Sequence, residues 1–516
     1  MRNVRREIED FERFEEIVRI LASNGFKDII TRVDLQHYLP ITDKYVNPEP
    51  TPQRFRETVE ELGTVFIKFG QMLAERKDLI PARYAEELKK LENEVPPFDP
   101  ERARQIVDEE VGLENFTDFS KDPIASASIA QVHTAKLENG DKVAIKVRRP
   151  GIVDKVRKDL DILKFLATEF EKHRDSNHEQ MRRDIEEFSL WTNKEMNLKN
   201  EAKNAERLRE NLSDEERIRI PKVYQELTTS TVLVTEYIEA FRVDEREKIE
   251  DIDISFEEIA RLGVRSQLKQ ILRDGFFHAD PHPSNFLVDR DGNLVYLDFG
   301  IMGKFTPKKR RLLTMMFYYT LSQDVEGLVD VLEELGYKED NYEREELKHK
   351  VEFIVLELSG TTLADNSFSK SFAKISLEAG NHGLYMPNDF IVMGKGMATM
   401  EGIGIDVYPE YSFEKENFDD IKQIMKEQFD PKDSMKDLGV DFLRNRDKLT
   451  KLTSNIVKSQ EDSAPEINIT NESNSRNLLP GALIVGSTIL FYKTLPEEYM
   501  MPIALAELLA AVHFLD

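Results

Sequence analysis

The sequence predicts an α+β protein with two lobes, a small lobe rich in strands followed by a larger helical lobe. Apolar residues alternate in the segment that ends at Lys146 and again in Pro221–Glu239, and this alternation predicts strands. From about residue 239 to about residue 450 the pattern is mainly helical. With 516 residues, of which 40% are hydrophobic, the chain is long enough for two lobes around real cores. We place the small lobe at residues 112–238 and the large lobe at 239–450.

Two polar clusters lie in the first part of the large lobe. His278-Ala-Asp280 is followed five residues later by Asn285, and Asp298-Phe-Gly300 comes after Asn293–Leu297, a segment that alternates as a strand. In phosphoryl transfer from ATP, the Asp of the first cluster takes or orients a hydroxyl proton, while the Asn and the later Asp hold Mg²⁺ against the phosphates. The order of these residues therefore predicts a bilobal, protein-kinase-like fold that uses ATP and Mg²⁺. Asp280 is the catalytic candidate, and Asn285 and Asp298 are the metal ligands.

The third element of such a site lies upstream. Val143-Ala-Ile-Lys146 is a strand that ends in a lysine, and a lysine at this place bridges the α- and β-phosphates when a helix carboxylate holds it. Glu201, in the charged helical stretch Lys194–Asn204, is the candidate carboxylate. The alternative is an exposed lysine on a strand, but the two clusters downstream favour the phosphate-binding interpretation.

The segment before this strand lacks the glycine-rich pattern G-x-G-x-x-G. Pro123–His133 is instead rich in alanine and serine, whose small side chains let backbone N–H groups approach phosphates. Alanine lacks the freedom of glycine at positive φ, so we expect a stiffer loop. The alternative is that this run is helical. The candidate ATP-binding residues here are Ala125, Ser126, Ala127 and Ser128.

Val232–Ile238 reads as a buried strand that leads to a hinge between the lobes. We expect the backbone from Glu236 to Ile238 to meet the adenine edge of ATP. Between the lysine strand and this segment, the chain turns at Arg148–Gly151 into a long charged helical insertion that runs to about residue 190.

On these motifs the chain resembles the UbiB/ADCK family of atypical kinases, from about residue 10 to the C-terminus. The matching elements are Lys68-Phe-Gly-Gln71 (the family's KxGQ element), the Ala-rich loop with Gln131-Val-His133, Val143–Lys146, the helix with Glu195 and Glu201-Ala-x-Asn204, His278–Asn285, and Asp298–Gly300.

The resemblance implies that the KxGQ element folds across the nucleotide site and that the carboxylates of a Glu-x-Asp motif engage it. Lys68, Gln71 and Glu195 are then regulatory residues that occlude the groove for protein substrates, so transfer of phosphate to proteins should be poor. The chain departs from the family where Asn197 replaces the Asp. An amide still forms hydrogen bonds but cannot neutralise Lys68 or help to bind a metal. We expect Glu195 to pair with Lys68.

The resemblance also implies an ATPase that supports isoprenoid-lipid (quinone) metabolism at a membrane. We expect the cytoplasmic face of a membrane, or a cytoplasmic protein with peripheral membrane association. Two alternatives stay open: a kinase for a small molecule or a protein, and a non-catalytic lipid-binding or scaffold protein that binds nucleotide as a structural ligand.

Composition excludes several function classes. The net charge of −26, from 72 basic and 98 acidic residues, argues against a nucleic-acid partner, which requires a basic face. The absence of cysteine excludes disulfides, cysteine–zinc sites and thiol nucleophiles. A hydrolytic metal site made of His278, Asp280 and His282 is an alternative, but it leaves the other motifs unexplained.

Residues 1–111 are predicted to form a helical N-terminal extension. Apolar residues from Ile8 to Leu21 recur at helical spacing, and the acidic polar face favours packing on the protein over contact with an anionic membrane. No apolar stretch typical of a signal peptide follows Met1. Further helices are predicted at Thr58–Glu75, which carries the KxGQ element, and at residues 98–111.

The C-terminal part changes character twice. Residues 451–477 are polar and without periodicity, which predicts a flexible linker. Residues 478–516 form two apolar runs, each shorter than the roughly 20 residues that a spanning helix needs. The resemblance implies a hydrophobic helical hairpin that associates with a membrane. The alternative is a helical pair packed on the kinase core or on a second protomer of a homodimer.

Overall fold

The computed structural model describes residues 11–26, 51–75, 80–91, 96–172, 179–243, 245–252, 254–279, 285–358 and 367–429. All of them belong to the first of the two units into which the chain divides, Met1–Asp430. The predicted linker at 451–477 and the apolar pair at 478–516 lie outside the described residues.

The small lobe is built on a five-stranded antiparallel sheet, in which β1, β3, β4 and β6 follow one another and β2 pairs with β3. Its strands are β1 (Phe116–Thr117), β2 (Ala125–Ser126), β3 (Ala130–Leu137), β4 (Lys142–Arg148) and β6 (Val232–Glu236). Side chains alternate across a strand, so Val143, Ile145 and Val147 enter the core beneath α7 (Pro100–Val111). Lys146 is therefore turned to the opposite face.

The Ala-rich run is a hairpin and not a helix. Strand β2 turns directly into β3, and the N–H of Ala127 donates to the carbonyl of Ala130 at 2.8 Å. The helical alternative for this run is wrong, because the segment completes the edge of the sheet.

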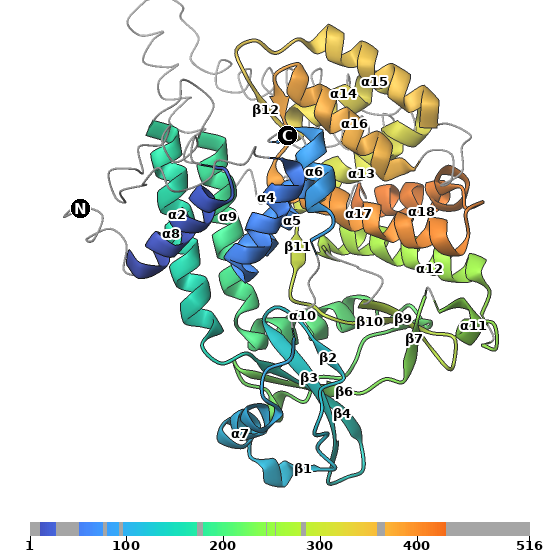
Figure 1. The fold of residues 1–516 in the computed structure, drawn as a ribbon. Helices are drawn as coiled ribbons and strands as arrows, with labels where there is room; N and C mark the ends of the chain where they lie inside the picture. Colours follow the sequence, from blue (N-terminus) through green and yellow to red (C-terminus); the bar gives the residue numbers. More distant parts are fainter. Residues whose placement is uncertain are drawn as a thin grey trace, which may run out of the picture. The chain divides into compact units, whose positions relative to one another are not determined.

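A group of helices packs beside the small-lobe sheet, and its core includes Ile129 and Ala130 at the start of β3. Helices α8 (Ile152–Lys172) and α9 (Glu179–Glu195) form the charged insertion and lie side by side with α2 (Phe11–Ser23) (Figure 1). Phe14, Ile17 and Val18 of α2 are buried in the core that these helices share with α4 (Pro52–Leu62), α5 (Thr64–Glu75) and α6 (Ala82–Leu88). The apolar face of the N-terminal helix is thus used for packing on the protein.

The helix predicted at Thr58–Glu75 is in fact two helices. Gly63 separates α4 from α5 and has φ 97°, a left-handed conformation that glycine adopts without a steric penalty. Periodicity continued across this glycine, so the sequence pattern alone did not reveal the break.

The large lobe begins at β7 (Ala240–Arg242), which is itself part of a sheet of this lobe. A four-stranded sheet has the order β5-β10-β9-β7, and β8 pairs separately with β11. The strand predicted at Asn293–Leu297 is β10 (Leu294–Tyr296), which forms an antiparallel hairpin with β9 (Phe286–Asp289). The other short strands are β5 (Ile218–Arg219), β8 (Phe276–His278), β11 (Met302–Lys304), β12 (Tyr337–Lys338) and β13 (Leu384–Tyr385).

Helices make up most of the large lobe and enclose its core (Figure 1). They are α11 (Arg246–Ile249), α12 (Phe256–Leu268), α13 (Pro307–Ser322), α14 (Val325–Leu335), α15 (Arg344–Leu358), α16 (Phe368–Asn381), α17 (Asn388–Val407) and α18 (Phe413–Gln428). Helix α12 continues as a π-helical turn, η4 (Lys269–Asp274), which ends at Gly275 with φ 60°. Helix α10 (Leu198–Asn211) leads from α9 back to the small-lobe sheet.

Candidate functional site

Lys146 of β4 and Glu201 of α10 form a bidentate ion pair. The Nζ atom of Lys146 lies 2.8 Å from Oε1 and 3.0 Å from Oε2 of Glu201. Both side chains are largely shielded, with 14% of Lys146 and 5% of Glu201 exposed. The pleat of β4 points Lys146 away from the sheet core, and Glu201 lies in the first turn of α10. The structure thus brings together the two residues that the sequence paired.

Asn197 fixes the start of that helix. Its side-chain oxygen accepts a hydrogen bond from the N–H of Lys199 at 3.1 Å, which makes it the N-cap of α10. Asn and Asp are comparably good N-caps. The amide that replaces the carboxylate of Glu-x-Asp therefore keeps the helix start and, with it, the placement of Glu201.

Asp298 lies next to this pair. Its Oδ1 atom is 3.5 Å from Nζ of Lys146 and accepts a hydrogen bond from the N–H of Gly300 at 3.1 Å. Its φ of 53° is left-handed, which is uncommon outside glycine and is found where a site over-determines the backbone. The side chain is 45% exposed, so the carboxylate is open to a ligand.

The three charges tune one another. Burial by itself would lower the pKa of Lys146, but the carboxylates of Asp298 and Glu201 outweigh it and raise the pKa above its ordinary value. Desolvation would raise the pKa of Asp298, yet the Lys146 ammonium and the N–H of Gly300 lower it. For Glu201, burial raises the pKa and Lys146 opposes the shift. At neutral pH the site therefore presents a lysine cation and an ionised Asp298, as phosphate and metal binding require.

His278 holds the backbone of Asp298. The His278 ring is buried, and its Nε2 lies 2.7 Å from the carbonyl of Asp298. A carbonyl only accepts, so Nε2 carries the proton and serves this hydrogen bond. Two glutamines fix His278 in turn: its N–H donates to Oε1 of Gln270 and its carbonyl accepts from Nε2 of Gln267, both at 2.9 Å. This use of Nε2 is structural and does not support the metal-ligand alternative for His278.

Asp280 and His282 lie outside the described residues, whereas Asn285 is described. The carbonyl of Asn285 accepts from the N–H of Leu297 at 2.8 Å, at the open end of the β9–β10 hairpin. Because Leu297 precedes Asp298, this pairing brings the two predicted Mg²⁺ ligands to neighbouring positions. Figure 1 shows the β9–β10 hairpin below α12.

The donor set fits magnesium. Carboxylate and amide oxygens are suitable ligands, and Mg²⁺ in ATP sites is held by one or two protein groups together with the phosphates. Within the described ranges there is no group of three or more His, Cys, Asp or Glu residues that could hold a metal on its own. Asn285 and Asp298 would supply oxygen ligands to the ion, and the nucleotide phosphates would supply others.

The KxGQ element approaches the site from α5. Lys68 forms an ion pair with Glu195, at the end of α9. The Glu195 side chain reaches Gly300, since its Cγ would lie 3.4 Å from a Cβ placed on that glycine. The charge of Lys68 also contributes to the lowered pKa of Asp298. Lys68 and Glu195 thus stand directly beside the Asp298–Gly300 segment.

The other two residues of the element hold α5 in place. A Cβ on Gly70 would lie 2.7 Å from Cδ1 of Leu91 and 3.0 Å from Cγ1 of Val59, so any larger residue here requires these side chains or the helix to shift. Nε2 of Gln71 donates to the carbonyl of Leu91 at 3.1 Å. Gln71 therefore contacts the chain after α6.

Arg149 fastens the Ala-rich hairpin. Its guanidinium donates to the carbonyl of Ala127 at 3.0 Å, to the hydroxyl of Ser126 at 2.8 Å and to the carbonyl of Pro96 at 2.8 Å. Ala125 and Ala127 are exposed, but Ser128 is buried. The loop is thus held by the cation that directly follows β4.

At the hinge, the Glu236 side chain has a structural partner. It binds Nη2 of Arg219 at 2.5 Å, and Arg219 also reaches Asp289 at 3.1 Å. The N–H of Glu236 also has a partner, because it donates to the carbonyl of Lys222 at 2.8 Å. Ile238, the other residue of the predicted adenine contact, is half-buried.

Several residues of the site had no role assigned from the sequence. Asn204 donates to the carbonyl of Phe299 at 2.9 Å, so α10 also holds the Asp298–Gly300 segment. Its position one helical turn after Glu201 was a usable signal, because residues three apart share a face. Gln267, Gln270 and Arg149 gave no local signal, since their partners are set by tertiary structure.

Comparison with known proteins settles the family. Residues 90–332 match the ABC1 atypical kinase-like domain. The chain is 31% identical to the probable protein kinase UbiB of Shewanella woodyi, over 85% of this chain and 84% of that protein. It is 33% identical to the corresponding protein of Marinobacter nauticus, over 69% and 67%. The chain belongs to the ABC1/UbiB family of atypical kinases.

Other family members extend further than this chain. The protein ACTIVITY OF BC1 COMPLEX KINASE 7 of Arabidopsis thaliana, from the chloroplast, is 33% identical, and the chain spans 53% of it. The chain spans 62% of an uncharacterized Synechocystis protein. Among solved structures, Rv3197 of Mycobacterium tuberculosis, determined in complex with erythromycin, is similar with a TM-score of 0.50 at 21% identity, over 72% of this chain and 93% of that one. This likeness supports the mixed α/β, kinase-like fold alone.

Proposed function

We propose that the protein binds Mg·ATP and acts as an atypical kinase or ATPase of the UbiB type. The observation that carries this proposal is the Lys146–Glu201 ion pair with Asp298 at 3.5 Å from the same lysine. In kinase-like folds this triad positions the phosphates and the metal, and catalysis depends mainly on such positioning.

Each residue has a defined task in this proposal. Lys146 binds the phosphates and Glu201 holds it. Asp298 and Asn285 hold Mg²⁺, which when bound neutralises the charge that develops on the phosphates. Asp280 orients the attacking hydroxyl or water. The Ala125–Ser128 hairpin covers the phosphates, and the backbone from Glu236 to Ile238 meets the adenine.

We favour hydrolysis over phosphorylation of proteins. Lys68 and Glu195 stand beside Gly300, and the family resemblance implies that they occlude the groove for protein acceptors. Helix α5 is packed there through Gly70 and Gln71 and is not a loosely attached element. Water reaches a site covered in this way more easily than a protein side chain does.

We further propose that the substrate context is isoprenoid-lipid (quinone) metabolism at a membrane surface, on the basis of the family and of the apolar residues 478–516. In a homodimer at the membrane, the contact between the two protomers would also involve residues 478–516. Across the parts of the chain that the structure describes, no helix combines the length and the apolar character needed to span a bilayer.

The test is phosphate release from Mg·ATP by the purified protein, with and without anionic liposomes. Asp280→Asn and a truncation after residue 477 are measured beside the wild type. Turnover that rises with liposomes and collapses in both variants supports a membrane-coupled ATPase. Mg²⁺-dependent ATP binding without phosphate release contradicts the proposed ATPase. Either the phosphate is then transferred to an acceptor, or the nucleotide is only a structural ligand. A transfer assay with labelled ATP and candidate acceptors distinguishes these two alternatives.

A further inference from the structure

One face of α10 contacts the large lobe along its whole length. After Glu201, Asn204 binds the carbonyl of Phe299, and the guanidinium of Arg207 lies 4.3 Å from the ring centre of Phe276. At the end of the helix, the carbonyl of Asn211 accepts from Nη2 of Arg273 at 2.6 Å. Spacings of three and four residues place these groups on one side of a helix. The helix that carries Glu201 is thus in contact with the segments around both His278 and Asp298.

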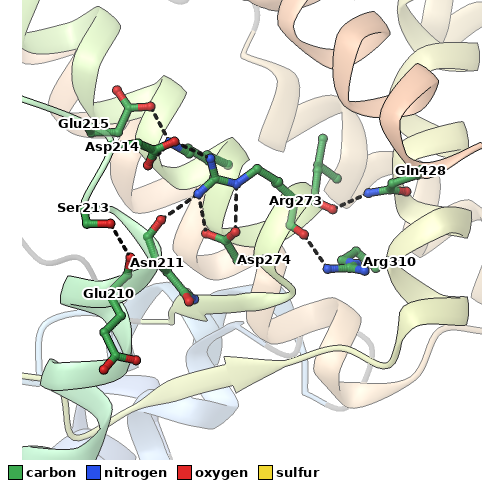
Figure 2. A network of polar contacts seen from close by, with 11 residues as sticks. Glu210, Asn211, Ser213, Asp214, Glu215, Arg273, Asp274, Arg310 and Gln428 are labelled. Atoms are coloured by element: carbon green, nitrogen blue, oxygen red, sulfur yellow. Dashed lines mark hydrogen bonds and ion pairs between the residues drawn. The ribbon is translucent and has the colours of Figure 1, made fainter. Parts of the chain in front are cut away.

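The C-terminal end of α10 is held by a cluster of ion pairs (Figure 2). Asp214, just beyond the helix, binds Nζ of Lys269 at 2.5 Å through one oxygen and Nη1 of Arg273 at 2.8 Å through the other. Glu215 binds Lys269 at 2.7 Å, and Asp274 binds Nε of Arg273 at 2.8 Å. Lys269 and Arg273 of η4 therefore both bind the segment that follows α10.

The turn that supplies these cations is unusual. It is π-helical, a conformation that is rare and is found mostly as single turns at functional sites. The large lobe fixes it from behind: Arg310 donates to the carbonyl of Arg273, and Nε2 of Gln428 donates to that of Leu272 at 2.5 Å (Figure 2). Between its two cations the same turn carries Gln270, which accepts from the N–H of His278. One turn, which Arg310 and Gln428 hold in place, thus binds both the end of α10 and the backbone of the His278 segment.

We propose that Asp214, Lys269 and Arg273 are positioning residues that clamp α10 and so keep Glu201 and Lys146 in register with His278 and Asp298. The inference rests on the proposed function, because the register matters only if the site binds Mg·ATP. Without the clamp, the end of α10 loses its attachment to η4, and the paired state of Lys146 and Glu201 is populated for a smaller fraction of the time. Since nucleotide selects the paired state, the apparent affinity falls in proportion to that fraction.

The experiment uses the full chain with Asp214→Asn and Arg273→Gln. Asp214 is 57% exposed, so the isosteric Asn removes a charge without disturbing the core. The matched control is Asp330→Asn: Asp330 is 63% exposed and binds Arg344 at 2.8 Å within a similar cluster on α14, far along the chain from the site. Asp214→Glu, which restores the charge, is the rescue variant.

Two readouts are needed. Hydrogen exchange of the amides of Leu198–Asn211 and Phe276–His278 reports the register directly and needs no activity. Steady-state phosphate release separates KM from kcat. We expect exchange in the first turns of α10 to rise and the KM for Mg·ATP to increase by about 3- to 10-fold in both variants, with kcat changed by less than about 2-fold because saturating nucleotide restores the paired state. The Asp330→Asn and Asp214→Glu variants should behave as wild type.

The proposal is overturned if exchange rises only around Asn211–Glu215, or equally in the Asp330→Asn control. It is also overturned if the wild type is active and the KM for Mg·ATP is the same in the wild type, Asp214→Asn and Arg273→Gln. If the wild type neither binds nor hydrolyses Mg·ATP, the proposed function fails, and the exchange around Glu201 alone decides whether the clamp exists. If Arg273→Gln lowers thermal stability, Asp214→Asn decides, because its side chain lies at the surface.

Discussion

The site contains two lysine–glutamate pairs, which differ in where the lysine comes from. Lys146 lies on β4, whose neighbours on both sides are strands of the same sheet, and it reaches Glu201 on α10. Lys68 lies on α5, among the helices that precede the small lobe, and it reaches Glu195 at the end of α9. The first pair belongs to the machinery that kinase-like folds share. The second pair places helix α5 beside Asp298. The comparison shows how an added helix can cover a site whose central ion pair is common to kinase-like folds.

The largest effect is expected for the first pair. Lys146→Met should lower phosphate release by about 100-fold or more, because a preorganised cation at the phosphates is lost. Lys136→Met is the control, since Lys136 is a half-exposed lysine on the neighbouring strand β3. Equal activity of the two variants in a phosphate-release assay would show that Lys146 is an ordinary strand lysine.

The second pair should act in the opposite direction on the metal. Lys68→Met removes a cation near Asp298 and frees Glu195, so we expect Mg²⁺ to bind about 3- to 10-fold more tightly in the presence of ATP. Titration of Mg²⁺ at fixed ATP measures this constant. Lys90→Met, at an exposed pair with Glu87, is the control. Weaker Mg²⁺ binding in Lys68→Met would mean that both lysines serve the phosphates.

The position of Lys68 depends on the packing of Gly70. Gly70→Ala places a methyl group 2.7 Å from Leu91, and we expect a loss of about 1–3 kcal/mol in the free energy of unfolding. Chemical denaturation measures it. Gly402→Ala in α17 is the matched control, because a Cβ there has nothing within 4 Å and alanine favours a helix by up to about 1 kcal/mol. An unchanged stability in Gly70→Ala would show that α5 moves away at little cost.

The smallest effect concerns the start of α10. Asn197→Ala should cost about 1 kcal/mol of stability through loss of the N-cap, whereas Asn197→Asp should be near neutral. Thermal unfolding of both variants checks this. A clear loss in Asn197→Asp would contradict the capping role and point to a constraint on charge near Lys68.

The sequence predicted those residues of the site that lie in segments with a clear local pattern, and it did not predict the others. Lys146, Glu201 and Asp298 could be found because each lies in or beside a segment with a clear local pattern, a strand, a charged helix and a second strand. The kinase-like order of the motifs then assigned the three residues to one site. The pairing of Lys68 with Glu195 came only with the family resemblance, since a lysine on a helix has no local signal. The break at Gly63 was missed because apolar periodicity runs through it.

The supports of the site were beyond prediction for a different reason. Asn204 with Phe299, Gln270 with His278 and Arg149 with Ala127 are contacts between one side chain and a backbone group, and only the tertiary fold selects the backbone group. The role of Asp280 as a catalytic residue stays a prediction, as does that of the apolar residues 478–516.

The π-helical turn also determines how the chain tolerates changes of length. Each of its i→i+5 hydrogen bonds spans one residue more than the corresponding bond of an α-helix, and each residue rotates an α-helix by about 100°. Deleting a single residue between Lys269 and Asp274 would restore an α-helical turn and swing the downstream side chains around the axis. Gln270 and Arg273 would then no longer face His278 and Asp214 together. Here the number of residues matters as much as their identity, so this short stretch should accept substitutions more readily than deletions.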